Sequence, residues 1–245
     1  MLKILSLGFL FPTARPVRDD LEKALEMKIL ITKNPEMVSN HPFLRFGNAT
    51  YVNINRGKDL ELNSQRGIVI CARKKVFSEI MKNNGIPSPE FSRYPSNTFP
   101  QIHRSLLSSY HGKGMTIVNT KEDANRVYGG WWTDLVKISR EFRVHVLGGK
   151  CVKIFEKKGD AIIKRAENSK FSKRDPKYFE DVYEYLNKKV NPLIPADYFA
   201  LDIGFIGNTR NIFVFEANSA PGLASNSLTR KMYVDFLVER IKERL

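Results

Sequence analysis

Two largely apolar segments, 198–206 and 212–217, flank the short stretch Gly-Asn-Thr-Arg-Asn at 207–211. Glycine and asparagine favour turns because both adopt turn backbone conformations at little cost. The pattern therefore predicts an antiparallel β-hairpin. If the turn centres on Thr209, Asp202 lies directly opposite Glu216.

This register brings polar side chains together on one face. Directly opposite residues have Cβ atoms about 5 Å apart, and Asn218 faces the same side as Glu216. Two carboxylates and an amide oxygen, without His or Cys, suit Mg²⁺ or Mn²⁺. Opposed like charges destabilise a sheet, so something must offset them. The alternative is a solvent-facing hairpin with two unrelated acids, but Ala200 and Ile206 share the Asp202 face and weigh against it.

The rest of the chain alternates strands and helices irregularly, with frequent hairpins, which predicts an α+β fold with antiparallel sheets. The apolar start precedes Arg15 and Arg18 and is interpreted as a buried strand rather than a signal peptide. Strands are expected at 2–10, 28–32, 67–71, 101–104, 115–119 and 132–137, hairpins at 141–147 with 150–156 and at 198–206 with 212–217, and helices at 18–28, 73–84, 121–129, 176–190 and 227–244.

The chain is globular in composition and strongly basic. It is 42% apolar and 27% charged, which argues against a disordered chain. Forty Lys and Arg against 26 Asp and Glu give a net charge of +14, so an anionic partner is expected: nucleotide phosphates, nucleic acid, an acidic peptide or a membrane surface. The segment 157–175 is rich in Lys and Arg and is expected to be mobile.

The cysteines and the hydropathy of the sequence indicate which cellular compartment the protein occupies. Cys71 and Cys151 are far apart and form no Cys-x-x-Cys motif, which indicates neither a disulfide framework nor a cysteine metal site. This fits a reducing compartment, and a cytoplasmic protein is expected. No apolar run reaches the length of a membrane span, so no membrane association is expected.

The end of the hairpin carries a family resemblance. The stretch Phe215-Glu-Ala-Asn-Ser-Ala-Pro-Gly-Leu223 resembles the ATP-grasp ligases, closest to the branch of the ribosomal-protein glutamate ligase and glutathione synthetase. That branch has an aspartate strand followed by Glu-x-Asn-x-x-Pro-Gly. Further matches occur in the family's order over roughly 70–245, at Lys74, 99–104, 112–115, 133–136, 141–143 and 148–149.

The resemblance implies a domain plan. ATP would lie between two α+β subdomains that clasp it. The small subdomain would cover 71–136, and the C-terminal subdomain with the metal site 137–245. Residues 1–70 would form a reduced N-terminal domain.

The resemblance also implies roles for individual residues. Backbone groups of the hinge residues Asp134 and Leu135 would bind the adenine, and the Glu141 carboxylate would bind the ribose. The phosphates would be bound by two cations and by glycine amides, namely Lys74, Arg104, Gly112 and Gly114. Further nucleotide-binding candidates in the mobile segment are Lys164, Arg165 and Asn168. Catalytic candidates are Arg143 and Lys157, which would stabilise the transferring phosphoryl group, and the metal ligands are Asp202, Glu216 and Asn218.

Each motif has a simpler interpretation, and two depart from the family. Lys74 lies in an Arg-Lys-Lys run, which by itself is usually a solvated face. Glu141 and Arg143 suit an exposed strand face equally well. Arg104 replaces the usual family lysine, and the glycine-rich loop contains His111 and Lys113.

The activity that the resemblance implies is ATP-dependent ligation of a carboxylate to an amine through an acylphosphate, with release of ADP and phosphate. The substrates would be small molecules or peptides. The basic surface suggests an anionic acceptor, either an acidic peptide or a nucleic acid. The alternative is a non-catalytic nucleotide- or nucleic-acid-binding protein on the same fold. The presence of Asp202, Glu216 and Asn218 argues against it.

Overall fold

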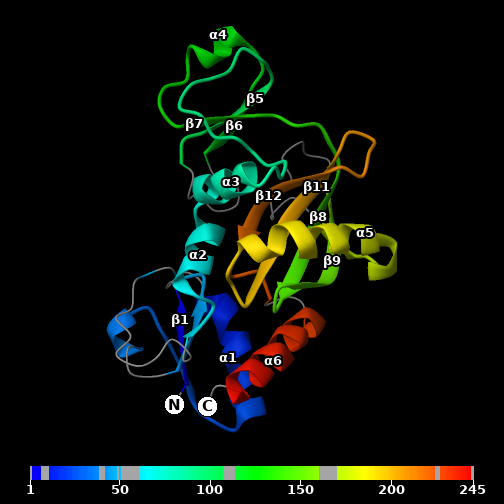
Figure 1. Ribbon diagram of the computed structural model, residues 1–245. Coiled ribbons are helices and arrows are strands. Elements are labelled where there is room, and N and C mark those ends of the chain that lie inside the picture. Colours follow the sequence, from blue (N-terminus) through cyan, green and yellow to red (C-terminus); the bar gives the residue numbers. More distant parts are fainter. Residues whose placement is uncertain are drawn as a thin grey trace.

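The computed structural model describes residues 2–6, 11–38, 42–48, 50, 61–106, 114–159, 170–223 and 227–243. Three sheets follow one another along the long axis of the molecule (Figure 1). A four-stranded sheet lies at the end that holds both termini, a five-stranded sheet in the middle and a three-stranded sheet at the far end.

The N-terminal sheet is parallel, so the expectation of antiparallel sheets is wrong here. Its order is β2-β1-β3-β4, and every neighbouring pair is parallel. The physical reason is the crossover helix α1, which returns the chain so that β2 runs beside β1 in the same direction. The bounds are β1 Leu2–Ser6, α1 Phe11–Leu25, β2 Ile29–Thr32, a 3₁₀ turn Pro35–Met37, β3 Phe43–Phe46 and β4 Glu61–Leu62.

Two helices connect this sheet to the rest. The apolar run 67–71, expected as a strand, is helical in α2 Gln65–Ala72. A short apolar run does not distinguish strand from buried helix. Here Ser64 accepts a hydrogen bond from the Gly67 amide and caps the helix. The expected helix at 73–84 is confirmed as α3 Lys74–Asn83.

The three-stranded sheet is antiparallel, with order β6-β5-β7. It contains β5 Gln101–Arg104, β6 Met115–Val118 and β7 Trp131–Asp134. The helix expected at 121–129 is a single turn, α4 Lys121–Ala124. Gly129 and Gly130 both have positive φ, which an α-helix does not accommodate. Trp132 is buried beside Val118 and Ala124.

The five-stranded sheet is antiparallel, with order β10-β9-β8-β11-β12, and both expected hairpins are confirmed. Residues 157–158 and 170–173 are paired strand residues, so the expected mobile segment is wrong at these positions; residues 160–169 lie outside the described part. The strands are β8 Ile138–Leu147, β9 Lys150–Lys158, β10 Lys170–Lys173, β11 Tyr198–Ile206 and β12 Ile212–Asn218.

Helices cover this sheet and join it to the N-terminal sheet. The segment expected as one helix at 176–190 is a 3₁₀ turn Pro176–Phe179, α5 Glu180–Tyr185 and a π-helical turn Leu186–Val190, followed by a 3₁₀ turn Asn191–Leu193. The last helix, α6 Ser227–Lys242, packs on α1 and shares a hydrophobic core with β1 and β3. None of the described helices is long and apolar enough to cross a membrane.

Candidate functional site

One face of the five-stranded sheet is charged. Asp202 in β11 lies opposite Glu216 in β12 and opposite Arg143 in β8, while Glu141 lies opposite Lys157 in β9. Opposite residues of a sheet point to the same side, so these five side chains share one face. The predicted Asp202–Glu216 register is confirmed. A bulge after Asp202 shifts the remaining pairs of the hairpin by one residue.

Ion pairs connect the charged residues. Arg143 donates from Nε and Nη2 to the two carboxylate oxygens of Asp202, both at 2.7 Å. Lys157 Nζ donates to Glu141 Oε1 at 2.7 Å, and Lys74 at the start of α3 pairs with Glu216. Arg143 and Lys74 thus offset the like charges of the hairpin. The sequence alone required such compensation but did not identify these residues.

The central pair stays ionised although Asp202 is buried. Asp202 is only 4% exposed, and burial alone would raise the pKa of its carboxyl group. The charges of Arg143, Lys157 and Lys74 outweigh burial and lower that pKa. Burial likewise opposes the charge of Arg143, but Asp202, Glu216 and Glu141 raise its pKa above the usual arginine value. The guanidinium therefore remains a fixed cation within the sheet face.

Arg104 extends the site from the three-stranded sheet. Its Nε is buried and has no hydrogen-bond partner among the described residues. Burial lowers its pKa, and Glu216 is close enough for its charge to act in the opposite direction. The chain therefore places an unsatisfied guanidinium donor near the acids, where it can bind an anion.

Asn218 has the second unsatisfied polar atom of this region. Its Nδ2 is buried without a partner among the described residues, and it lies opposite Ala200, two residues beyond Glu216. The Asn218 amide oxygen and the carboxylates of Asp202 and Glu216 are of the ligand type that hard cations take. No group of three or more His, Cys, Asp or Glu side chains in the described part of the chain is arranged to hold a metal; this set has two acids and one amide.

The predicted hinge lies at the end of β7. The Asp134 carboxylate accepts hydrogen bonds from Gln101 Nε2 at 3.1 Å and from Ser96 Oγ at 3.2 Å. The Leu135 amide donates to Pro100 O at 3.3 Å. An adenine at the hinge would therefore use the Leu135 carbonyl, or displace this long bond to reach the amide.

Gly114 closes the β5–β6 connection. Ser105 N donates to Gly114 O at 2.9 Å. Gly114 has a φ of +73°, and a Cβ there would lie 2.2 Å from Ser105 Oγ. The glycine is thus required by the backbone, whatever it binds. Four predicted residues, Gly112, Lys164, Arg165 and Asn168, lie outside the described part of the chain.

Sequence reasoning missed one cation on the charged face. Lys153 lies two positions from Phe155 and four from Lys157 on β9. Because alternate residues of a strand share a face, this spacing could have placed Lys153 on the face of Lys157. His145 lies opposite Lys153, and its Nδ1 is 2.8 Å from Tyr233 OH. Burial, followed by the charge of Arg143, lowers the pKa of His145 to about 3, so the ring is neutral.

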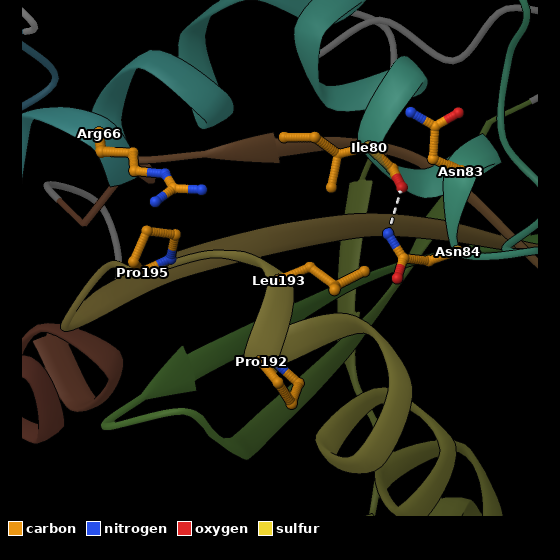
Figure 2. A pocket seen from close by; sticks show the side chains of 7 residues that line it. All are labelled: Arg66, Ile80, Asn83, Asn84, Pro192, Leu193 and Pro195. Carbon is orange, nitrogen blue, oxygen red and sulfur yellow. Dashed lines mark hydrogen bonds between the residues drawn. The ribbon is translucent and has the colours of Figure 1, made fainter.

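Two cavities lie away from this face. One, of about 400 Å³, is lined by residues of α2, α3 and the segment after α5. Figure 2 shows Arg66 and Leu193 at this cavity and the hydrogen bond from Asn84 Nδ2 to Ile80 O. The other, of about 630 Å³, is lined by residues that include Arg140, Arg174 and Arg210. Neither includes a predicted site residue.

Comparison with known proteins gives structural likenesses alone. No protein-family model matches the sequence, and no curated protein is similar to it. D-alanine–D-alanine ligase from Bacillus anthracis complexed with ATP has a TM-score of 0.67 at 13% identity, covering 99% of this chain and 97% of that one.

Two further solved structures have the same architecture. The ATP-grasp ligase PsnB, complexed with minimal precursor, Mg and ADP, has a TM-score of 0.69 at 10% identity, and the match covers 98% of this chain and 96% of that one. N5-carboxyaminoimidazole ribonucleotide synthetase from Thermotoga maritima has a TM-score of 0.63 at 15% identity and covers 93% of this chain and 70% of that one. These likenesses confirm the predicted fold class.

Proposed function

We propose that this chain, which has the ATP-grasp fold, is an ATP-dependent carboxylate–amine ligase. The observation that carries the proposal is the in-register set Asp202, Glu216 and Arg143, with the unsatisfied donor of Arg104 nearby. The three-part division at 70 and 136 and the ribosomal-protein glutamate ligase branch remain part of this proposal.

ATP is proposed to lie between the three-stranded sheet and the charged face. Arg104 and Lys74 then bind phosphate oxygens, arginine with a planar fork and lysine as a point charge. Glu141 accepts hydrogen bonds from the ribose, and hinge backbone at Asp134 and Leu135 binds adenine. Gly112, Gly114, Lys164, Arg165 and Asn168 are proposed to complete the phosphate contacts.

Asp202, Glu216 and Asn218 are proposed to hold Mg²⁺, with Mn²⁺ as a substitute, because they supply two carboxylates and one amide. Support comes from the PsnB complex, which contains Mg and ADP. Such a cation neutralises phosphate charge and polarises the transferring group. The chain's own contribution is Arg143, held in place by both oxygens of Asp202.

The reaction needs no protein nucleophile. An oxygen of the substrate carboxylate attacks the γ-phosphorus, the bond to ADP breaks, and an acylphosphate forms. The amine then attacks the acyl carbon, phosphate leaves, and the amine loses a proton. Arg143 and Lys157 stabilise the charge on the transferring group, so positioning and electrostatics supply the rate enhancement.

The test is ADP release from ATP and Mg²⁺ with pools of carboxylates, amines, acidic peptides and nucleic acids. Glu216→Gln is expected to abolish release. Its matched control is Glu90→Gln, because Glu90 also pairs with a lysine, Lys82, but on the surface and outside the site. Full activity in Glu216→Gln would contradict the site, and nucleotide binding without ADP release from any pool would favour a binding protein.

A further inference from the structure

Lys153 is a buried cation on the charged face. It lies in β9 opposite His145, and the residue is 6% exposed. Its Nζ donates to Thr229 Oγ1 at 3.0 Å and lies 5.3 Å from the centre of the Phe155 ring. Among the described residues, this ammonium contacts a hydroxyl and an aromatic ring, and neither carries a formal negative charge.

Lys157 provides a direct contrast on the same strand and face. It is 8% exposed, nearly as buried as Lys153, and it pairs with Glu141 at 2.7 Å. Lys153 forms no ion pair with a carboxylate of the described residues. Burial, and then the charge of Lys173, lowers its pKa. A buried ammonium without a counter-ion is costly, so an anion is the group that its surroundings lack.

The position of Lys153 relative to Arg143 limits what this anion can be. Arg143 lies opposite Phe155, and Lys153 lies opposite His145. These two cross-strand pairs are separated by two residues along each strand. Such a step is on the order of 7 Å. A short carbon chain spans such a distance, with one end at Arg143 and the other at Lys153, and Phe155 lies between these two cations along the strands.

We infer that Lys153 binds a second carboxylate of the substrate, so that the carboxylate substrate is a short dicarboxylate or an acidic amino acid. The inference rests on the proposed function for the reaction at the first carboxylate. A carboxylate rather than a phosphate is inferred because one ammonium balances one negative charge, and because the residue between the two cations, Phe155, is apolar.

The first test compares two lysine-to-methionine variants by thermal unfolding. Lys153→Met removes an uncompensated charge and keeps the length of the side chain, so the unfolding midpoint should rise by several degrees. Lys157→Met leaves Glu141 unpaired, so its midpoint should fall. If Lys153→Met falls in the same way, Lys153 is a structural residue and the inference is wrong.

The second test measures binding to the full chain without nucleotide. At matched ionic strength, glutarate should raise the unfolding midpoint of the wild type but not of Lys153→Met, and the neutral diamide of glutarate should raise neither. Equal stabilisation of wild type and variant would place the anion elsewhere. Stronger, Lys153-dependent stabilisation by inorganic phosphate would overturn the carboxylate assignment.

The third test uses the substrate found by ADP release. Lys153→Met should raise the KM for the acidic substrate about tenfold or more, the effect of losing a charged hydrogen bond. Its kcat and its KM for ATP should be unchanged. A lower kcat with unchanged KM would contradict the inference. Absence of ADP release in the wild type would refute the proposed function, and the unfolding and glutarate results would still decide the role of Lys153.

Discussion

The two faces of the five-stranded sheet are built from alternate residues of the same strands and differ in almost every physical respect. On one face most side chains are apolar, buried and packed against α2, α3 and α5, with the Arg140–Glu156 ion pair at the end of the strands as the exception. The other face carries the acids Asp202 and Glu141, each held in a cross-strand ion pair with a cation. The neighbours Leu201 and Asp202 point to opposite faces, and each is almost completely buried.

The difference between the two faces indicates which face contributes to the stability of the fold and which face carries the charged site. Burial of the apolar face is favourable by itself. Burial of the charged face is tolerated only because each acid has a cation beside it, as Asp202 has Arg143. Removing one member of such a pair leaves the other uncompensated. The charged face should therefore be sensitive to the loss of charge, and the apolar face to the loss of volume.

The largest expected effect is that of Asp202→Asn. Viewed from the sequence, removing one of two opposed carboxylates relieves repulsion and leaves the fold intact. The ion pair reverses this expectation, because Arg143, whose side chain is only 20% exposed, loses the carboxylate that both of its donors bind. Urea unfolding should show a loss of about 3–5 kcal/mol, and turnover should be abolished. The double variant with Arg143→Met should recover part of the stability. Wild-type stability in the Asp202→Asn single variant would mean that the charged face does not depend on this ion pair.

Leu201→Ala tests the other face at the adjacent residue. Leu201 is completely buried, so the substitution should cost about 2–5 kcal/mol of unfolding free energy through lost burial and a residual cavity. Calorimetry at low temperature should find ATP affinity unchanged. Loss of ATP binding in the folded variant would mean that the two faces are not independent.

Arg104, in the three-stranded sheet, tests whether the charged site binds the phosphates of ATP. Arg104→Ala should weaken ATP binding by about 1.5–3 kcal/mol, the range for a hydrogen bond to a charged group. Arg104→Lys should restore much of the affinity. Calorimetry decides, and an unchanged dissociation constant in Arg104→Ala would exclude its side chain from the phosphate site.

The last expected effect, the smallest when taken for a single pH unit, is a pH dependence from His145. Its pKa falls from 6.5 to about 3 on folding, so the unfolded chain binds more protons between these values. Stability should therefore be lost as pH falls from 6.5 toward 3, by up to about 1.4 kcal/mol per pH unit. His145→Gln should flatten the part of this slope above pH 4.5. Below that value Glu156, whose pKa is lowered to about 2 chiefly by Arg140, adds a slope of the same sign.

That slope can be measured by urea unfolding at pH 5 and pH 7. Wild type and His145→Gln should differ in their change of stability between the two pH values. An identical change would mean that His145 titrates normally in the folded protein.

Local sequence pattern predicted the hairpins well because their partners are close along the chain. Turn residues at 207–211 set the register of Asp202 against Glu216, and Gly148 with Gly149 set the turn between β8 and β9. The same reasoning failed at 67–71, where a short apolar run suits either a strand or a buried helix.

The parallel N-terminal sheet also escaped prediction. Strand direction there depends on a crossover helix, and neighbours such as β1 and β3 are far apart in the sequence. Turn chemistry cannot specify such a pairing, because no single turn connects the two strands.

By itself the sequence determined which residues alternate along β8, β9, β11 and β12, and hence that acids and cations gather on one face. Only the tertiary structure decided the partners: Arg143 for Asp202, Lys74 for Glu216 across 142 positions, and no carboxylate of the described residues for Lys153. The physical reason is that alternation is a local property of extended backbone. The balance of buried charge depends on which distant segments pack together.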